Sequence, residues 1–274
     1  MKKVLITGCS GYIGSHLCKM LHNSYEVYGL DINLPQVDTL TDYYDIDIRK
    51  MFDISEEFDC VIHLAALVNV GESEMKPIQY YITNLNGTMN VLNKIKTKNF
   101  IFASTGAAQD CCSAYGISKR AAEDVVREFA TKHKPMPYTI FRFYNVIGSD
   151  GFAPTNPDGL MYNLLKTYDT GEFTLFGTDY NTSDGTCVRD YVHVNEICDA
   201  LRTAIETPSN STECLGHGVG RTVNEIVDMF KAVNNVTFDV IAGPRRKGDI
   251  ESSVLENVSP FMKNLYSLEE LLKV

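Results

Sequence analysis

The chain has 274 residues, of which 44% are hydrophobic and 22% charged, and its formal net charge is -10. This composition excludes a disordered or fibrous protein, and the length allows one large α/β domain or a major and a minor lobe. The negative charge argues against non-specific binding to nucleic acids or anionic membranes. Since no apolar run approaches the ~18 residues of a membrane span, we expect no membrane partner and a cytoplasmic location.

The eight cysteines form no Cys-x-x-Cys pair, so the sequence indicates neither a zinc knuckle nor a thioredoxin-like motif, and we expect no metal. Adjacent Cys111 and Cys112 are the only candidates for redox chemistry. A reducing compartment fits this pattern.

Apolar segments and helical patterns alternate along the first half of the chain. Strands are predicted at 3–7, 26–31, 60–64, 99–103 and 138–142, and helices from about residue 13, over 77–94 and over 114–133. Such alternation is typical of parallel βαβ units. We therefore predict an α/β fold with a doubly wound parallel sheet in residues 1–145. Residues 146–274 are predicted to form a smaller C-terminal lobe that is partly interleaved with the first.

Gly8, Gly11 and Gly14 lie between the first strand and the first helix. Glycines in this context let the backbone approach a pyrophosphate at a helix N-terminus, which predicts a Rossmann-type dinucleotide site. The spacing is G-x-x-G-x-x-G rather than G-x-G-x-x-G, and a glycine-rich turn without a ligand is the alternative. Asp31 ends the second strand, where an acid can bind the ribose hydroxyls. Because no arginine follows it, NAD is favoured over NADP.

Tyr115 and Lys119 lie four residues apart at the start of a predicted helix, so both side chains can face one cleft. A free phenol has a pKa of about 10. A nearby lysine and a positive nicotinamide ring both favour the phenolate, and we expect them to lower the pKa of Tyr115. A Tyr-x-x-x-Lys motif alone is common by chance, but it is stronger evidence for a catalytic pair when it follows a dinucleotide-binding motif.

Longer motifs make the resemblance to a known family plain. The chain opens with Thr7-Gly-Cys-Ser-Gly-Tyr-Ile-Gly14, continues with Val70-Gly-Glu-Ser73 and Asn84-Leu-Asn-Gly-Thr88, and later carries Asp184-Gly-Thr-Cys-Val-Arg-Asp-Tyr-Val-His193 and Pro244-Arg-Arg-Lys-Gly-Asp249. It resembles the UDP-glucose (UDP-galactose) 4-epimerases of the extended short-chain dehydrogenase/reductase superfamily. The similarity covers nearly the whole chain, and residues 184–193 are its most specific part.

The resemblance implies roles for individual residues. Tyr115 would be the base, Lys119 would bind the nicotinamide ribose, and Thr105 would bond to the sugar 4-hydroxyl. Those implied to bind the cofactor are Gly8, Gly11, Tyr12, Ile13, Gly14, Asp31, Asp47, Ile48, Leu64, Ala65, Ala66, Asn84 and Lys119. Those implied to bind the UDP-sugar are Asn145, Leu160, Phe176, Arg189, Tyr191, Arg246, Asp249 and Ser253.

The implied reaction is a transient oxidation at C4, in which hydride leaves for NAD⁺ and returns to the other face of the 4-keto sugar. The implied partners are a UDP-sugar and a second copy of the chain, since the helices at 77–94 and 114–133 match those that pair in related dimers. Ser253 falls where related epimerases carry either a bulky tyrosine or a small residue. We therefore expect the N-acetylated UDP-sugars to be accepted as well.

The sequence also departs from the family pattern. Only ten residues lead from Thr105 to Tyr115, Val68 replaces a frequent cofactor-contacting lysine, and Gly159 replaces a substrate-binding asparagine. These changes bear on cofactor retention and on the choice of sugar.

Three alternatives stay open. A nucleotide-sugar 4,6-dehydratase or reductase is the nearest, but dehydratases follow the threonine with Asp-Glu, and here Gly106-Ala107 follow. A decarboxylase of the superfamily would carry Glu where Ala107 stands. A non-catalytic NAD-binding regulator is disfavoured because Tyr115 and Lys119 are both retained.

Overall fold

Alternating strands and helices build a central seven-stranded sheet in the computed structural model, which describes residues 1–149, 151–246, 249–263 and 265–274. The strand order is β12-β8-β7-β5-β1-β2-β3. The pairings of β1 with β2 and β5, of β2 with β3, and of β5 with β7 are all parallel. The strands are β1 (Lys3–Thr7), β2 (Glu26–Asp31), β3 (Asp42–Asp45), β5 (Cys60–His63), β7 (Phe100–Thr105), β8 (Tyr138–Phe143) and β12 (Asn210–Leu215).

The five predicted strands are all present, and the doubly wound parallel sheet of the Rossmann type is confirmed. Two edge strands, β3 and β12, were not predicted. The β3 sequence Asp-Tyr-Tyr-Asp contains no aliphatic residue, and none of its residues is fully buried. Because an edge strand packs less apolar surface, its hydrophobic pattern is weak. A further short parallel pair joins β4 (Glu57–Phe58) to β6 (Lys96–Thr97).

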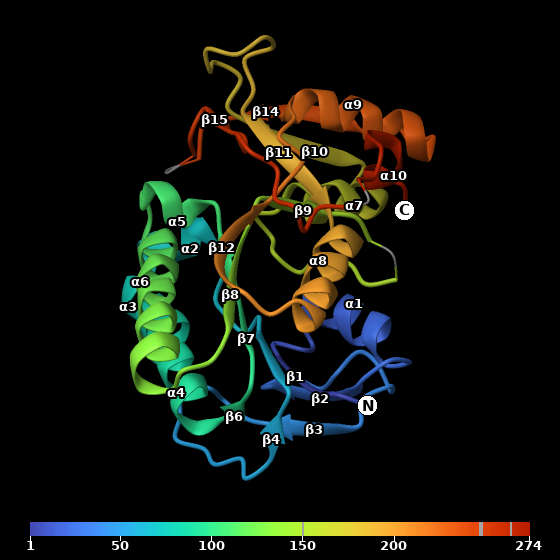
Figure 1. The fold of residues 1–274 in the computed structure, drawn as a ribbon. Helices are drawn as coiled ribbons and strands as arrows, with labels where there is room; N and C mark the ends of the chain where they lie inside the picture. Colours follow the sequence, from blue (N-terminus) through green and yellow to red (C-terminus); the bar gives the residue numbers. More distant parts are fainter. Residues whose placement is uncertain (150, 247–248, 264) are drawn as a thin grey trace. The chain divides into compact units, whose positions relative to one another are not determined.

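Helices cover both faces of this sheet (Figure 1). The predicted helix at 77–94 consists of α3 (Pro77–Tyr80), a π-helical turn η1 (Tyr81–Asn86) and α4 (Gly87–Lys94). The predicted helix at 114–133 consists of α6 (Ala114–Glu128) and a second π-helical turn, η2 (Phe129–His133). The remaining helices here are α1 (Tyr12–Leu21), α2 (Val70–Met75), α5 (Ala107–Asp110) and α8 (Val194–Glu206).

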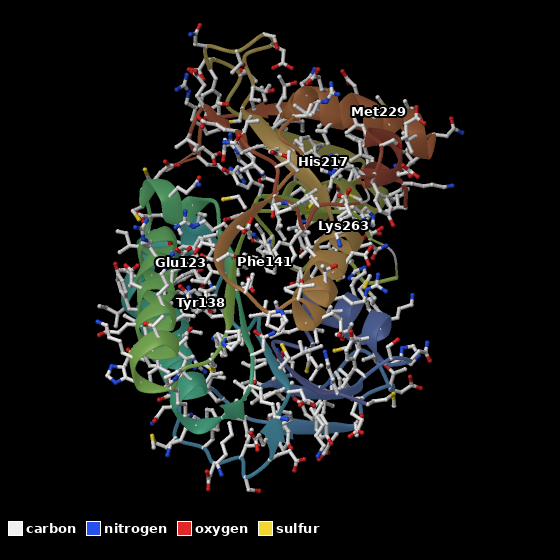
Figure 2. All side chains as sticks on the ribbon, viewed as in Figure 1. Glu123, Tyr138, Phe141, His217, Met229 and Lys263 are labelled. Carbon is white, nitrogen blue, oxygen red and sulfur yellow. The ribbon has the colours of Figure 1, made fainter. Side chains whose placement is uncertain are left out.

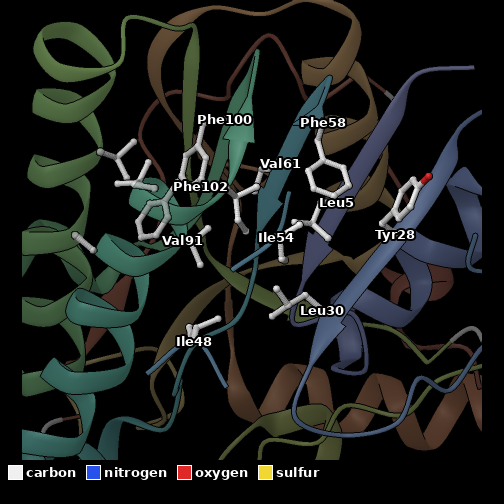
Figure 3. Packing of buried hydrophobic residues seen from close by; sticks show 14 of the residues in the cluster. Leu5, Tyr28, Leu30, Ile48, Ile54, Phe58, Val61, Val91, Phe100 and Phe102 are labelled. Carbon is white, nitrogen blue, oxygen red and sulfur yellow. The ribbon is translucent and has the colours of Figure 1, made fainter. Parts of the chain in front are cut away.

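The core beneath α4 and α6 forms because the strands are apolar throughout while each helix is apolar on one face only. Leu5, Leu30 and Val61 from the strands pack with Val91 of α4 and Val126 of α6. Figure 3 shows part of this cluster, including Phe100 and Phe102 on β7. The buried face of α6 also carries two charged residues, Lys119 and Glu123.

The C-terminal part has its own sheets and core. Strand β11 (Val188–His193) pairs with β9 (Asn145–Ile147), β13 (Gly220–Thr222) and β15 (Ser252–Ser253), and β10 (Glu172–Phe176) pairs with β14 (Asp239–Gly243). The helices are α7 (Leu160–Thr170), α9 (Val223–Asn234) and α10 (Leu268–Leu272). Their buried faces meet in a cluster that includes Leu164, Phe173, Ile226, Phe230 and Leu271.

The chain divides into two compact units. The first contains Met1–Arg142 and Cys198–Glu213, and the second contains Phe143–Ile197 and Cys214–Val274. The division falls before Phe143, the last residue of β8, and the chain returns to the first unit through the C-terminal part of α8. In the described parts of both units, no helix has the length and apolarity needed to cross a membrane.

Candidate active site

The turn between β1 and α1 is shaped by its glycines. Gly8 has a φ of +75°, and a Cβ on it would lie 2.7 Å from the backbone nitrogen of Ala65. A Cβ on Gly14 would lie 2.1 Å from the carbonyl oxygen of Gly8, a distance no side chain can adopt. Gly11 is the N-cap of α1 and offers no capping side chain. The first amides of α1, including those of Tyr12 and Ile13, thus point at a space that can receive an anion.

Asp31 ends β2 beside this turn. One carboxylate oxygen accepts the Ser10 amide at 3.1 Å, and the other accepts the amides of Ile32 and Asn33 at 2.7 and 3.0 Å. These bonds fix the carboxylate next to the glycine-rich turn, in the position from which an acid can bind ribose hydroxyls.

The loop after β5 contains the predicted residues Leu64, Ala65 and Ala66, which are half-buried. The side chain of Asn84 holds this loop from η1: its oxygen accepts the Leu67 amide at 2.8 Å and its nitrogen donates to the Leu67 carbonyl at 3.0 Å. The same nitrogen donates to Ser118 on α6 at 3.0 Å. Asn84 therefore shapes the loop rather than offering a free amide, and it lies in a π-helical turn, a feature often found at functional sites.

Asp47 and Ile48 follow β3. Arg49 binds both carboxylate oxygens of Asp47 at 2.8 Å, and this hydrogen bonding lowers the pKa of Asp47. The Ile48 side chain is buried against Gly87 of α4. Ile48 thus anchors the segment in the core, and Asp47 lies at its half-buried surface.

His63 was not singled out in the sequence, yet it is the centre of a buried hydrogen-bond chain. Its Nδ1 lies 2.6 Å from the Thr7 hydroxyl, and its Nε2 lies 3.0 Å from the Thr88 hydroxyl. Thr88 donates to the carbonyl of Asn84, so it accepts from Nε2, and Nδ1 accepts from Thr7. Burial lowers the pKa of His63 to about 3, so the ring is neutral. The feature of the sequence that could have identified His63 is its position at the end of an apolar strand.

The N-terminus of α6 carries Tyr115. Ser113 caps the helix by accepting the Gly116 amide at 3.1 Å, and Glu74 of α2 accepts the Ala114 amide at 3.0 Å. The Tyr115 ring packs edge-on against Tyr80, with ring centroids 6.4 Å apart. The short segment before it folds as α5, and a Cβ on Gly116 would lie 2.4 Å from the Ala107 carbonyl oxygen. Close packing of α5 on α6 therefore takes the place of a longer loop.

The Tyr115 hydroxyl lies within reach of Thr105, the last residue of β7. Burial raises the pKa of Tyr115 to about 12, and a hydrogen bond with Thr105 offsets part of that rise. This direction is opposite to the one expected from the sequence. The sequence could not reveal how strongly the fold buries the phenol, and desolvation disfavours the phenolate.

Lys119 lies one turn further along the buried face of α6. Its ammonium stands 4.1 Å from the centre of the Phe102 ring, and among the described residues it has neither a hydrogen-bond nor an ion-pair partner. Burial lowers the pKa of Lys119 to about 7, while the charge of Glu123 acts to raise it. A buried ammonium with its donors unused is suited to bind hydroxyl groups of a ligand.

In the second unit, the residues predicted to hold a diphosphate gather around Asp249. Its carboxylate accepts from Nε of Arg246 at 2.9 Å and lies 3.8 Å from the guanidinium of Arg189. The Arg246 guanidinium also stands 5.3 Å from the centre of the Phe176 ring, and Ser253 pairs with Arg189 between β15 and β11. The structure thus brings together five of the eight predicted residues.

The other three lie nearby in the same unit. Asn145 pairs with Tyr191 between β9 and β11, and its side chain donates to the Asp190 carbonyl at 3.1 Å. Leu160 begins α7, just after the Asp158 carbonyl that accepts from Arg246 at 2.9 Å. Within the described residues, no three His, Cys, Asp or Glu side chains gather as a metal site.

Comparison with known proteins identifies the family to which the chain is similar. Residues 4–216 match the family described as the NAD dependent epimerase/dehydratase family. The chain is 32% identical to a UDP-glucose 4-epimerase of Haemophilus influenzae, over 90% of this chain and 87% of that protein. It is 36% identical to probable UDP-arabinose 4-epimerase 3 of Arabidopsis thaliana, over 90% of this chain and 72% of that protein.

Its fold is similar to that of the UDP-glucose 4-epimerase from Bifidobacterium longum, solved in complex with NAD⁺ and UDP. The TM-score is 0.84 at 26% identity, with 98% of this chain and 96% of that chain covered. The family match spans well over half of the 274 residues. The chain therefore belongs to the NAD dependent epimerase/dehydratase family.

Proposed function

We propose that the protein is an NAD-dependent isomerase that inverts C4 of a UDP-sugar by transient oxidation to a 4-keto intermediate. The observation that carries this proposal is the placement of Tyr115 and Lys119 one turn apart on the buried face of α6, with Thr105 at the end of β7. A phenol, a hydroxyl and an unpaired ammonium are the groups that removal of a sugar hydroxyl proton requires.

The first unit fits a dinucleotide. Gly8 and Gly14 allow a tight turn in which any Cβ would clash with backbone atoms. The N-terminal amides of α1 are unused by a capping side chain, and Asp31 stands beside the turn. Asp31 favours NAD because its charge repels a 2′-phosphate. The turn with Gly8 and Gly14, together with Asp31, would hold NAD⁺, which would supply a reversible hydride acceptor for C4 of the sugar.

The chain supplies the proton chemistry. Tyr115 removes the proton of the 4-hydroxyl, and Thr105 bonds to the same hydroxyl and orients it. Lys119 holds ribose hydroxyls, and its charge favours the Tyr115 phenolate. Burial opposes that phenolate in the free chain, so the base requires a positive charge nearby, which Lys119 carries when it is protonated.

The second unit supplies the residues for the nucleotide. Arg189 and Arg246 share the carboxylate of Asp249, and guanidinium forks suit a diphosphate. Phe176 offers an aromatic ring at the end of β10. We assign the UDP group to this cluster, with Asn145, Leu160, Tyr191 and Ser253 lining it.

A second copy of the chain is the partner that we propose. Met75, Ile78, Ile82 and Met89 are exposed along α2, α3, η1 and α4, and Ile117 is exposed on α6, which packs against these helices. Exposed apolar side chains at helical spacing are typical of a helix-pairing interface. We also propose a cytoplasmic location, since all eight cysteines are free.

A coupled assay with UDP-galactose tests the proposed function. Tyr115→Phe is expected to lower turnover at least ~10²-fold, the low end for loss of a general base, because the ring keeps its packing while the proton acceptor is lost. Tyr168→Phe on α7, where the side chain is exposed, is the matched control. Near-normal turnover by a folded Tyr115→Phe protein would refute the assignment, and an inactive wild type would refute the function.

A further inference from the structure

Glu123 is a fully buried carboxylate on α6 (Figure 2), and it lies one helical turn beyond Lys119. It has no part in the proton chemistry proposed for Tyr115, Thr105 and Lys119. An isolated buried charge costs several kcal/mol of folding free energy. Its retention on the same face as the Tyr115–Lys119 pair therefore needs an explanation.

Four hydrogen bonds keep this carboxylate ionised and fixed. Arg142 of β8 donates to both oxygens at 2.8 and 2.7 Å, Arg127 donates at 2.7 Å, and Ser104 of β7 donates at 2.6 Å. Burial alone would raise the pKa of Glu123, but the bonds from Arg142, Ser104 and Arg127 outweigh it and the pKa lies below its ordinary value. The carboxylate is therefore negative at any pH at which the enzyme works.

The surroundings of Lys119 show why that charge matters. Facing it are the neutral His63 from β5, the Phe102 ring from β7, and Tyr115 and Glu123 on its own helix. Burial lowers the pKa of Lys119, and Glu123 is the group that acts to raise it. Ser104 directly precedes Thr105, so the same carboxylate also ties α6 to the end of β7 that carries the bond to Tyr115.

We propose that Glu123 is a positioning residue of the reaction, whose buried carboxylate keeps Lys119 in its charged form beside Tyr115. The proposal rests on the proposed function for its kinetic consequence only. In the proposed reaction the active form has Tyr115 as phenolate and Lys119 as ammonium, so the two groups titrate as a pair. Without the charge of Glu123, the last proton leaves Lys119 more readily, so a larger share of the singly protonated pair is neutral phenol with neutral amine.

The test uses Glu123→Gln, which keeps the shape and loses the charge, with Asp124→Asn as the matched control. Asp124 is the neighbouring acid, is exposed, and also pairs with Arg127. In the ligand-free protein labelled with ¹³Cε-lysine, the Lys119 signal is assigned by its absence in Lys119→Met and titrated by NMR. We expect its midpoint, about 7 in the wild type, to fall by roughly one pH unit in Glu123→Gln and to stay in Asp124→Asn.

Kinetics gives the second readout. In Glu123→Gln, the acidic limb of the kcat–pH profile with UDP-galactose should move to lower pH while its plateau falls about tenfold. A plateau loss with an unmoved limb and an unmoved Lys119 midpoint would show a purely structural role and overturn the inference. Inactivity of the wild type would refute the proposed function, while the NMR titration would still decide the role of Glu123.

Glu123→Gln removes the carboxylate charge that Arg142 and Arg127 bind, and this can prevent folding. In that case the double variant Glu123→Gln/Arg142→Gln is used, and the Lys119 midpoint should still fall but by less than in the single variant, because loss of the Arg142 charge acts in the opposite direction; an unchanged or raised midpoint would overturn the inference. Glu123→Asp keeps the charge and should leave the midpoint within a few tenths of a unit. A midpoint that falls equally in Glu123→Asp would overturn the inference.

Discussion

At the scale of single residues, the buried Lys119 lowers the stability of the ligand-free protein. Lys119 is buried against Phe102 without a hydrogen-bond or ion-pair partner among the described residues, and its pKa in the folded chain is about 7. In the unfolded chain it is near 10.4. The free protein therefore carries a penalty that a bound ligand with hydroxyl groups would relieve.

Replacement of Lys119 by Met should accordingly stabilise the ligand-free protein while abolishing turnover. Between pH 7 and about 10.4 the unfolded chain holds the lysine proton more tightly, so wild-type stability rises with pH over this window, and the full penalty is present below it. Urea unfolding near pH 6.5 should show Lys119→Met more stable by roughly 2–4 kcal/mol, with a smaller gain near pH 9.5. A variant less stable than the wild type at pH 6.5 would contradict this account.

Ser253 sets a second expectation at this scale, one that rests on the resemblance to epimerases. It is half-buried on β15, beside Arg189 of β11, and we expect so small a side chain to leave room for an N-acetyl group on the sugar. The wild type should turn over UDP-N-acetylgalactosamine, and Ser253→Tyr should lower kcat/KM for that substrate about tenfold or more, a steric cost of over 1.4 kcal/mol. UDP-galactose should be affected less. Equal use of the N-acetylated sugar by Ser253→Tyr would remove Ser253 as the determinant.

At the scale of elements, the β1–α1 turn shows how backbone geometry makes a binding site. The three glycines make this turn possible, and they differ in how much space a side chain would have. A Cβ would lie 3.3 Å from the nearest backbone atom at Gly11, 2.7 Å at Gly8 and 2.1 Å at Gly14. Only Gly8 among them also has a positive φ. By these distances the turn tolerates a side chain least at Gly14, somewhat more at Gly8 and most at Gly11.

Alanine at these positions should weaken NAD binding in the same order. Gly11→Ala needs only a shift of a few tenths of an ångström and should cost little affinity, whereas Gly14→Ala must displace the backbone of Gly8 and should cost at least about tenfold. Calorimetry with NAD measures the series, and thermal unfolding monitors folding. Gly171→Ala, where a Cβ would meet nothing within 4 Å but φ is +70°, controls for the backbone strain of losing a glycine away from this turn. Equal affinities across Gly11→Ala and Gly14→Ala would contradict the steric account.

At the scale of the whole molecule, the exposed apolar side chains on α2, α3, η1, α4 and α6 form the surface through which we propose that two copies pair. Ile78 is 67% exposed and Ile82 is 40% exposed, four residues apart on one helical face. Ile78→Asp with Ile82→Asp should convert a dimer into a monomer, because burying two carboxylates in a pairing interface is costly. Light scattering at micromolar concentration measures the mass. Met51→Asp, exposed elsewhere, should leave the dimer intact, and a monomeric wild type would contradict the proposal.

The sequence by itself determined the five apolar strands, the glycine-rich turn and the Tyr-x-x-x-Lys spacing, because each is a local pattern that needs no partner to be visible. It did not indicate β3, whose edge position leaves a polar sequence, nor the π-helical turns η1 and η2 within two predicted helices. The raised pKa of Tyr115 was also missed, because desolvation depends on what packs around the phenol.

The hydrogen bonds that hold the candidate active site in place could be known only from the tertiary structure. His63, Asn84 and Glu123 join segments that are 17 to 56 residues apart in the chain. The spacing of Glu123 from Lys119 was readable as one helical turn, but its partners Ser104 and Arg142 come from two other elements. A buried charge is tolerated only where distant segments bring compensating groups to it, and that convergence is a property of the fold.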